Sequence, residues 1–172
     1  MRRSFRSTSS AFVILIATAS PLGATMVERM ALERVTHEAS RIVHAAVAEV
    51  RSGRDEAGLP VTWVTLEVAR TLKGPGISRF TIKQYGVAEP LPDGTIARVA
   101  GLPRYVAGEE VVLFLRADSR RGFTSPVGFG QGAYRIGRAG PRAVVRSDLP
   151  TGGPQDLDEF LSKVARLVAG AK

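Results

Sequence analysis

The sequence predicts a mainly β fold, a compact antiparallel barrel or sandwich of about six strands with one helix near each end of the domain. Three observations lead to this prediction. Short segments with alternating apolar and polar residues recur along the chain. Turns rich in glycine and proline separate them. Helical spacing of apolar residues is confined to the two ends, and 172 residues suit one domain.

The first 24 residues have the pattern of a cleavable signal peptide. Three arginines stand among the first six residues, and the nine-residue apolar run 11–19 follows. We expect cleavage after Ala24, with Ala19 as the alternative, and a single domain over residues 25–172. The run is shorter than the roughly 20 residues that span a bilayer. An uncleaved membrane anchor is the other interpretation. The sequence thus predicts an exported protein, periplasmic or extracellular.

The net charge and the absence of cysteine exclude several kinds of functional site in the predicted exported domain. The formal charge of +8 falls to +5 without the three arginines of the signal. The chain has no cysteine, which excludes disulfides, cysteine-based zinc sites, thiol nucleophiles and a lipid on an N-terminal cysteine. Of the 24 basic residues, 20 are arginine. We interpret this bias as genomic composition rather than as a binding surface.

The first half of the domain predicts a helix and two long strands. Residues 26–39 have the spacing of a short amphipathic helix. Residues 41–51 have no strongly polar face, which is typical of a central strand. Residues 52–60 predict a loop. Residues 61–73 alternate most clearly and predict a half-buried strand.

The middle of the chain adds two strands on either side of a long loop. Residues 77–85 alternate after a Gly-Pro-Gly turn and should pair antiparallel with the preceding strand. The segment from Gly86 to Ala107 is rich in turn residues, with one short strand expected around residues 95–99. Loops of this length are commonly functional or disordered. Residues 110–116 are apolar on both faces and predict a buried strand.

Short strands and one helix complete the prediction. We expect strands at residues 123–127, 133–136 and 143–146. Glycines 128, 130 and 132 suggest a bulged or kinked strand, with a close backbone approach at Gly132. The C-terminal helix should cover about residues 156–169. Asp156 is its N-cap, and an apolar stripe runs along it at positions 157, 160, 161, 164, 167 and 168.

Three segments carry a resemblance to a known group of proteins. They are LERVTHEASRIVHAAVAEV (32–50), VTWVTLEVARTLKG (61–74), and GEEVVLFLR (108–116) followed by GQGAYRI (130–136). The chain resembles small exported bacterial proteins of unknown function. The order and spacing of the three segments are similar to those of the OB-like barrel of the netrin/tissue-inhibitor-of-metalloproteinase superfamily. The resemblance implies that fold over about residues 32–136. Those inhibitors bind the protease metal through an N-terminal cysteine, which this chain lacks.

No catalytic, cofactor or metal site is predicted. His37 and His44 are the only histidines, and a metal site would need Glu38 or Glu49 beside them at no recognised ligand spacing. Neither Ser125 nor Ser147 lies in a nucleophile elbow. Glu109 and Glu110 are adjacent, so alternation along a strand should point them to opposite faces.

These observations favour a non-enzymatic binding or interaction protein of the cell envelope or exterior. A protease inhibitor, by analogy of fold, and an unrecognised hydrolase are the alternatives. The long loop 86–107 is the best candidate contact surface. An unknown protein or an anionic envelope polymer is the expected partner, and nucleic acid is not. Seven arginines in the C-terminal third suggest the polymer: Arg116, Arg120, Arg121, Arg135, Arg138, Arg142 and Arg146.

Overall fold

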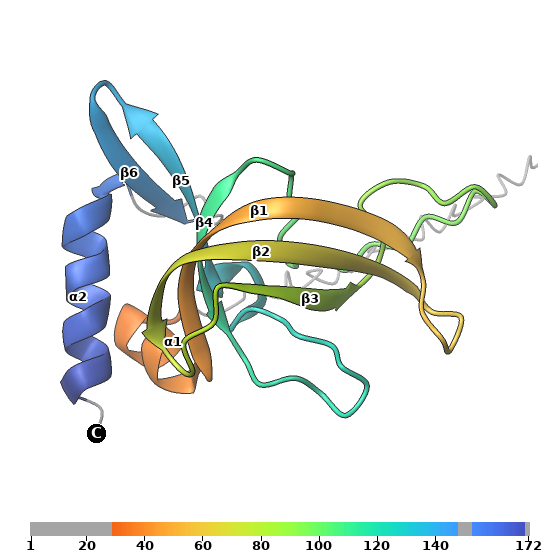
Figure 1. Cartoon of the computed structure of the whole chain (residues 1–172), viewed down its shortest axis with the longest axis horizontal. Helices are drawn as coiled ribbons and strands as arrows, with labels where there is room; N and C mark the ends of the chain where they lie inside the picture. Colours follow the sequence, from red (N-terminus) through yellow and green to blue (C-terminus); the bar gives the residue numbers. More distant parts are fainter. Residues whose placement is uncertain (1–28, 148–152, 171–172) are drawn as a thin grey trace, which may run out of the picture.

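A computed structural model describes residues 29–147 and 153–170 (Figure 1). The predicted signal peptide, 1–24, lies outside the described residues. Within them, seven antiparallel strands form one sheet in the order β3-β2-β1-β4-β5-β6-β7, with two α-helices. The mainly β class with two terminal helices is therefore confirmed. The elements are α1 (Leu32–Glu38), β1 (Arg41–Arg54), β2 (Pro60–Lys73), β3 (Arg79–Tyr85), β4 (Glu110–Leu115), the 3-10 helix η1 (Phe129–Gly132), β5 (Ala133–Ala139), β6 (Arg142–Ser147), β7 (Gln155–Asp156) and α2 (Leu157–Gly170).

The first helix is shorter than the sequence predicts. Helical spacing suggested residues 26–39. Residues 26–28 lie outside the described residues, residues 29–31 are not helical, and α1 begins at Leu32. Ala31 has extended geometry, with φ −65° and ψ 149°, and its side chain cannot cap the helix. The backbone N–H of Met30 donates instead to Oε1 of Gln131, 2.6 Å away. This bond ties the segment before the helix to η1, so the chain enters α1 extended.

The β1–β2 hairpin is longer than predicted because its loop is only five residues. Pairing continues to Arg54 opposite Pro60, where the sequence suggested a loop over residues 52–60. The carboxylate of Asp55 accepts the N–H groups of Ala57 and Leu59, both at 3.0 Å, and so closes the turn. Register shifts interrupt the ladder between Ile42 and Glu49. Such shifts bend a strand, and β1 and β2 are long curved ribbons in Figure 1.

Strand β4 is buried on both faces from Val111 to Leu115, and β1 is buried on both faces at Ile42 and Val43, in keeping with their apolar patterns. One face contributes Val43, Val111 and Leu113 to a cluster enclosed by β1 to β4, which we call the barrel core. The opposite face contributes residues such as Ile42 to a second cluster beneath α1 and α2, the helix core. Both strands are central in the sheet. The helix core contains Val35, Ala39, Ile42, Val112, Phe114, Val127, Val145, Leu157, Phe160, Leu161 and Val164.

The segment 123–127 closes the sheet into a barrel-like shape without being a full strand. Pro126 bridges Leu115 of β4, and Phe123 bridges Lys83 of β3 in parallel. The N–H of Thr124 donates to the carbonyl of Lys83 at 2.9 Å. The two strands at opposite ends of the β3-β2-β1-β4 series are thus linked through this segment. The strand expected here is reduced to isolated bridges.

Two other strand predictions are corrected. Residues 95–99 form no strand, because the carbonyls of Thr95 and Ala97 accept local bonds from Leu91 and Val87 within the loop. Residues 129–132 form the 3-10 helix η1 rather than a kinked strand. Gly128 starts it in the left-handed region, at φ 59°.

The close approach at Gly132 is confirmed. A Cβ there would lie 2.8 Å from the backbone nitrogen and oxygen of Val127 and 2.9 Å from the carbonyl oxygen of Phe114. The N–H of Val127 donates to that same carbonyl at 2.8 Å. Only glycine fits between these two backbones. It lets η1 pass directly beneath the closure segment 123–127.

The C-terminal helix is confirmed together with its cap. The carboxylate of Asp156 accepts the N–H groups of Asp158 and Glu159, at 3.0 and 3.2 Å. The apolar stripe of α2 packs on the helix core, and Figure 1 shows the helix beside β6. The ring of Phe160 lies 4.8 Å from that of Tyr134, centroid to centroid. None of the helices within the described ranges has the length and apolar character to cross a membrane.

Candidate binding site

The long loop that the sequence singled out covers a cavity at one end of the barrel. The loop cavity, as we call it, has a volume of about 460 Å³. This lies within the range of about 300 to 1,000 Å³ found for small-molecule sites. All its lining residues belong to the loop, to β3 or to β2. They are Thr62, Gln84, Tyr85, Gly86, Val87, Ala88, Ala97, Arg98, Val99, Ala100, Leu102, Pro103, Arg104 and Tyr105.

Hydrogen bonds hold the base of this loop over the barrel. The N–H of Gly86 donates to Pro60 at 2.9 Å, and that of Val87 donates to Ala97 at 2.8 Å. Gly86 has φ 98°, and a Cβ there would lie 2.9 Å from the Ala97 oxygen, so the turn requires glycine. On the other side of the cavity, the guanidinium of Arg104 donates to the carbonyl of Ala88 at 2.7 Å. The cavity therefore has a wall fixed on two sides.

The tip of the loop is anchored to the β1–β2 hairpin. The guanidinium of Arg54 donates to the carboxylate of Asp93 at 2.7 Å and to the hydroxyl of Thr95 at 2.8 Å. The N–H of Thr95 donates to Asp93 at 2.9 Å. Hydrogen bonds from Thr95, and then from Arg54, hold the pKa of the Asp93 carboxyl far below its usual range. Asp93 is thus ionised at any pH near neutral and is committed to this anchor.

The floor of the loop cavity contains a buried amide. Gln84 is only 6% exposed, and its Nε2 has no hydrogen-bond partner among the described residues. Thr62 beside it is satisfied, because its hydroxyl donates to the carbonyl of Gly86 at 2.9 Å. An unpartnered buried donor costs about 1–3 kcal/mol. Buried polar groups are normally hydrogen-bonded, and an acceptor atom on a bound ligand would give this amide its missing partner.

All the charged side chains that line the loop cavity are positive. Its lining contains two arginines and no acidic residue. Arg98 is exposed, and within the described chain it forms no ion pair. Arg104 reaches the Ala88 carbonyl, a neutral partner, so its charge is not neutralised there. The cavity therefore combines apolar walls with an uncompensated positive charge.

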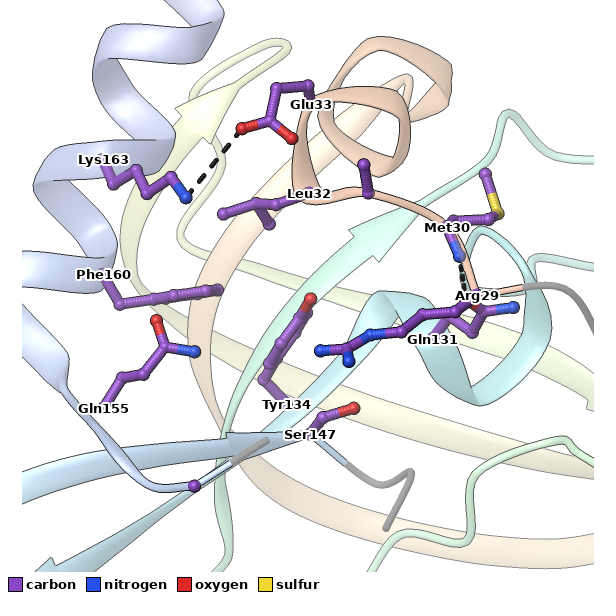
Figure 2. A pocket seen from close by; sticks show the side chains of 12 residues that line it. Arg29, Met30, Leu32, Glu33, Gln131, Tyr134, Ser147, Gln155, Phe160 and Lys163 are labelled. Atoms are coloured by element: carbon purple, nitrogen blue, oxygen red, sulfur yellow. Dashed lines mark hydrogen bonds and ion pairs between the residues drawn. The ribbon is translucent and has the colours of Figure 1, made fainter. Parts of the chain in front are cut away.

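A second cavity, the helix cavity, lies where the start of α1 meets α2 (Figure 2). Tyr134 and Phe160 form an aromatic wall, and Lys163 on α2 lies 3.9 Å from Glu33 on α1. Burial raises the pKa of Tyr134, against a smaller opposing effect of Arg29. Its lining adjoins residue 28 and the segment 148–152, which are outside the described residues.

A third hollow, of about 810 Å³, is open and mixed in charge. The guanidinium of Arg51 lies 4.2 Å from the ring centre of Trp63, and Arg121 stands nearby. Lys83, which also lines it, is paired with Asp55 at 3.2 Å. Acidic groups therefore share this hollow with the basic ones, which distinguishes it from the loop cavity.

The arginines of the C-terminal third are not gathered into one site. Arg116 pairs with Glu38 at 2.5 Å, and Arg135 pairs with Glu109. Three others lie along the β5–β6 hairpin, at positions 138, 142 and 146. Arg121 lines the third hollow. The structure thus divides among several elements the set that suggested an anionic polymer.

The two histidines are not brought to a common site. His37 lies in the last turn of α1, and Glu38 at the end of that helix is bound by Arg34 and Arg116, which lower its pKa. His44 lies on β1, where its Nε2 is 2.5 Å from a carboxylate oxygen of Glu110. The sequence did not indicate this pair, because it depends on the pairing of β1 with β4.

The other candidate residues have structural neighbours. Glu109 accepts the N–H of Val106 at 2.8 Å and pairs with Arg135, while the adjacent Glu110 meets His44. Ser147 lines the helix cavity, and the carbonyl of Ser125 accepts the N–H of Arg116. Across residues 29–147 and 153–170, no three acidic or histidine side chains are grouped in a way that could hold a metal ion.

The chain was also compared with known proteins. No protein-family model matches it, and no curated protein sequence matches it either. The candidate site is therefore defined by the geometry of this chain's own residues. Among the cavities described above, the loop cavity combines the volume of a small-molecule site with apolar walls and a net positive lining.

Proposed function

We propose that this protein is an exported, non-enzymatic binding protein whose ligand occupies the loop cavity. The observation that carries the proposal is the cavity itself. It has the volume of a small-molecule site, and its wall is the loop that the sequence had marked as a contact surface. The ligand is a small molecule, or a group of that size on an envelope component.

The way in which the loop is held supports this assignment. Both its base and its tip are fixed by hydrogen bonds to the barrel or to the β1–β2 hairpin. A site that is formed before the ligand arrives loses less conformational entropy on binding. The unpartnered amide of Gln84 at the floor gives the same site a polar contact to offer.

Native mass spectrometry tests the proposal with two variants of one loop. The exported protein is incubated with a small-molecule extract of the cell envelope. Val99→Trp fills the cavity from a lining position, while Ile96→Trp adds the same ring at a position that is 63% exposed and outside the lining. We expect the wild type and Ile96→Trp to retain the same added mass, and Val99→Trp to lose it.

Two results would contradict this assignment. Equal retention by all three proteins would place the ligand elsewhere, and no added mass in any of them would remove the binding function. Export is checked separately by N-terminal sequencing of the protein recovered outside the cytoplasm. A start at Thr25 is expected, and a retained Met1 would indicate an anchored protein instead.

A further inference from the structure

The loop cavity offers a ligand an apolar surface along most of its walls. Val87, Val99 and Leu102 line it together with Pro103 and the ring of Tyr85. Transfer of hydrocarbon from water to such a surface is favourable by roughly 25 cal/mol per Å² of area buried. The part of the ligand inside the cavity should therefore be a hydrocarbon chain or ring.

The charged groups that line the cavity favour a negative ligand, and the one exposed acidic residue beside it in the loop, Glu89, is not part of the lining. Arg98 and Arg104 line the cavity, and no carboxylate does. The acidic group at the loop tip, Asp93, is already bound by Arg54. Glu109, at the far end of the loop, is bound by Arg135. The positive charge of the two lining arginines is thus left for a ligand.

The polar groups of the lining agree with the charge. Arginine side chains donate hydrogen bonds and accept none, and Nε2 of Gln84 is a donor without a partner. A carboxylate is a pure acceptor, and the planar guanidinium group matches its geometry. A cationic group such as ammonium would bring a repelled charge and no hydrogen-bond acceptor.

Resting on the function proposed above, we infer that the ligand of the loop cavity is an apolar carboxylate. Its hydrocarbon part lies against the valine, leucine and proline side chains of the loop. Its carboxylate lies toward Arg98 and Arg104. The inference thus selects one chemical class from the small molecules that a cavity of about 460 Å³ could hold.

Three probes with the same eight-carbon chain length test this assignment: octanoate, octanamide and octyltrimethylammonium. Each is titrated into isotope-labelled exported protein and followed by amide NMR. We expect octanoate to shift the amide signals of residues 84–105 and to bind about tenfold or more tightly than octanamide. The ammonium probe should bind more weakly than octanamide.

Two arginine variants separate a specific contact from general attraction. Arg98→Gln should lower octanoate affinity to about that of octanamide. Arg138→Gln removes the same charge from the β5–β6 hairpin, away from the cavity lining, and should leave the affinity unchanged. An equal loss in both variants would mean that net charge alone attracts octanoate, and would overturn the inference.

The outcomes also distinguish this inference from the proposed function. If octanamide or the ammonium probe binds the same amides as tightly as octanoate, the cavity is a binding site but the ligand class is wrong. If none of the three probes shifts these amides, the carboxylate inference is wrong. The proposed function is then still decided by the mass-spectrometric comparison of Val99→Trp with Ile96→Trp.

Discussion

Gly132 is the position where a single methyl group should disturb the fold most. A Cβ there would lie 2.8 Å from two backbone atoms of Val127 and 2.9 Å from the carbonyl oxygen of Phe114. Real Cβ atoms essentially never approach other atoms within 3.0 Å. Backbone on both sides cannot rotate away as a side chain could. Gly132→Ala must therefore separate the segment 123–127 from β4.

The expected loss of stability is the sum of an overpacking cost and the cost of one broken hydrogen bond. Overpacking of a well-packed site costs about 1–3 kcal/mol. The hydrogen bond from Val127 to Phe114, 2.8 Å long, lies at the same contact, and its loss adds roughly 0.5–1.5 kcal/mol. We expect Gly132→Ala to lower the free energy of unfolding by about 2–4 kcal/mol.

Urea unfolding followed by circular dichroism measures this change. The matched control is Gly137→Ala on the strand β5 that follows Gly132, where an added Cβ meets no atom within 4 Å and φ is not positive. The control should be neutral or gain up to about 1 kcal/mol from the less flexible unfolded chain. A Gly132→Ala protein as stable as the Gly137→Ala protein would refute the close approach.

Four further changes test other parts of the structure. Phe160→Ala should lower the free energy of unfolding by about 3–5 kcal/mol in the same assay, because the ring is 2% exposed in the helix core. Asp156→Ala removes the cap of α2 and should cost about 1 kcal/mol, more than the exposed control Asp158→Ala. Gln84→Met should raise the free energy of unfolding of the ligand-free protein by about 1 kcal/mol, since it removes a buried donor without a partner. The depressed pKa of Asp93 contributes stability above its unfolded pKa of about 3.9, and this contribution is lost as the pH falls through the lower folded value. The free energy of unfolding, measured by urea titrations between about pH 6 and pH 2, should therefore fall less steeply with decreasing pH for Asp93→Asn than for wild type. Identical slopes would contradict the loop anchor.

Sequence patterns predicted the structure correctly where residues close together in the chain decide the conformation. The N-cap at Asp156 and the apolar stripe of α2 lie within a few turns of each other, and both are confirmed. The central position of β1 was predicted because neither of its faces is polar. The close approach at Gly132 was predicted from glycine spacing, although the element around it was not.

Predictions failed where a distant partner decides the conformation. The start of α1 is set by Gln131, about one hundred residues away, which binds the backbone of Met30. Residues 123–127 look like a strand but meet β3 and β4 only at isolated bridges. The sequence marked the loop 86–107 as a contact surface. It could not show the cavity beneath it, whose floor comes from β2 and β3 through Thr62 and Gln84.

The two-sided burial of β4 and of the start of β1 links the two layers of the molecule during unfolding. If the helices detached, Ile42 and the outer face of β4 would be exposed while the inner faces still held the barrel. Neither layer can open without weakening the other, so the amide hydrogens of β4 and of β1 near Ile42 and Val43 should exchange with solvent only when the whole domain unfolds. It also means that Ile42 and Val43, adjacent in the chain, have different neighbours. Substitutions at these two positions should be compensated by changes in different parts of the sequence: near Ile42 by α1 and α2, and near Val43 by β2 and β3.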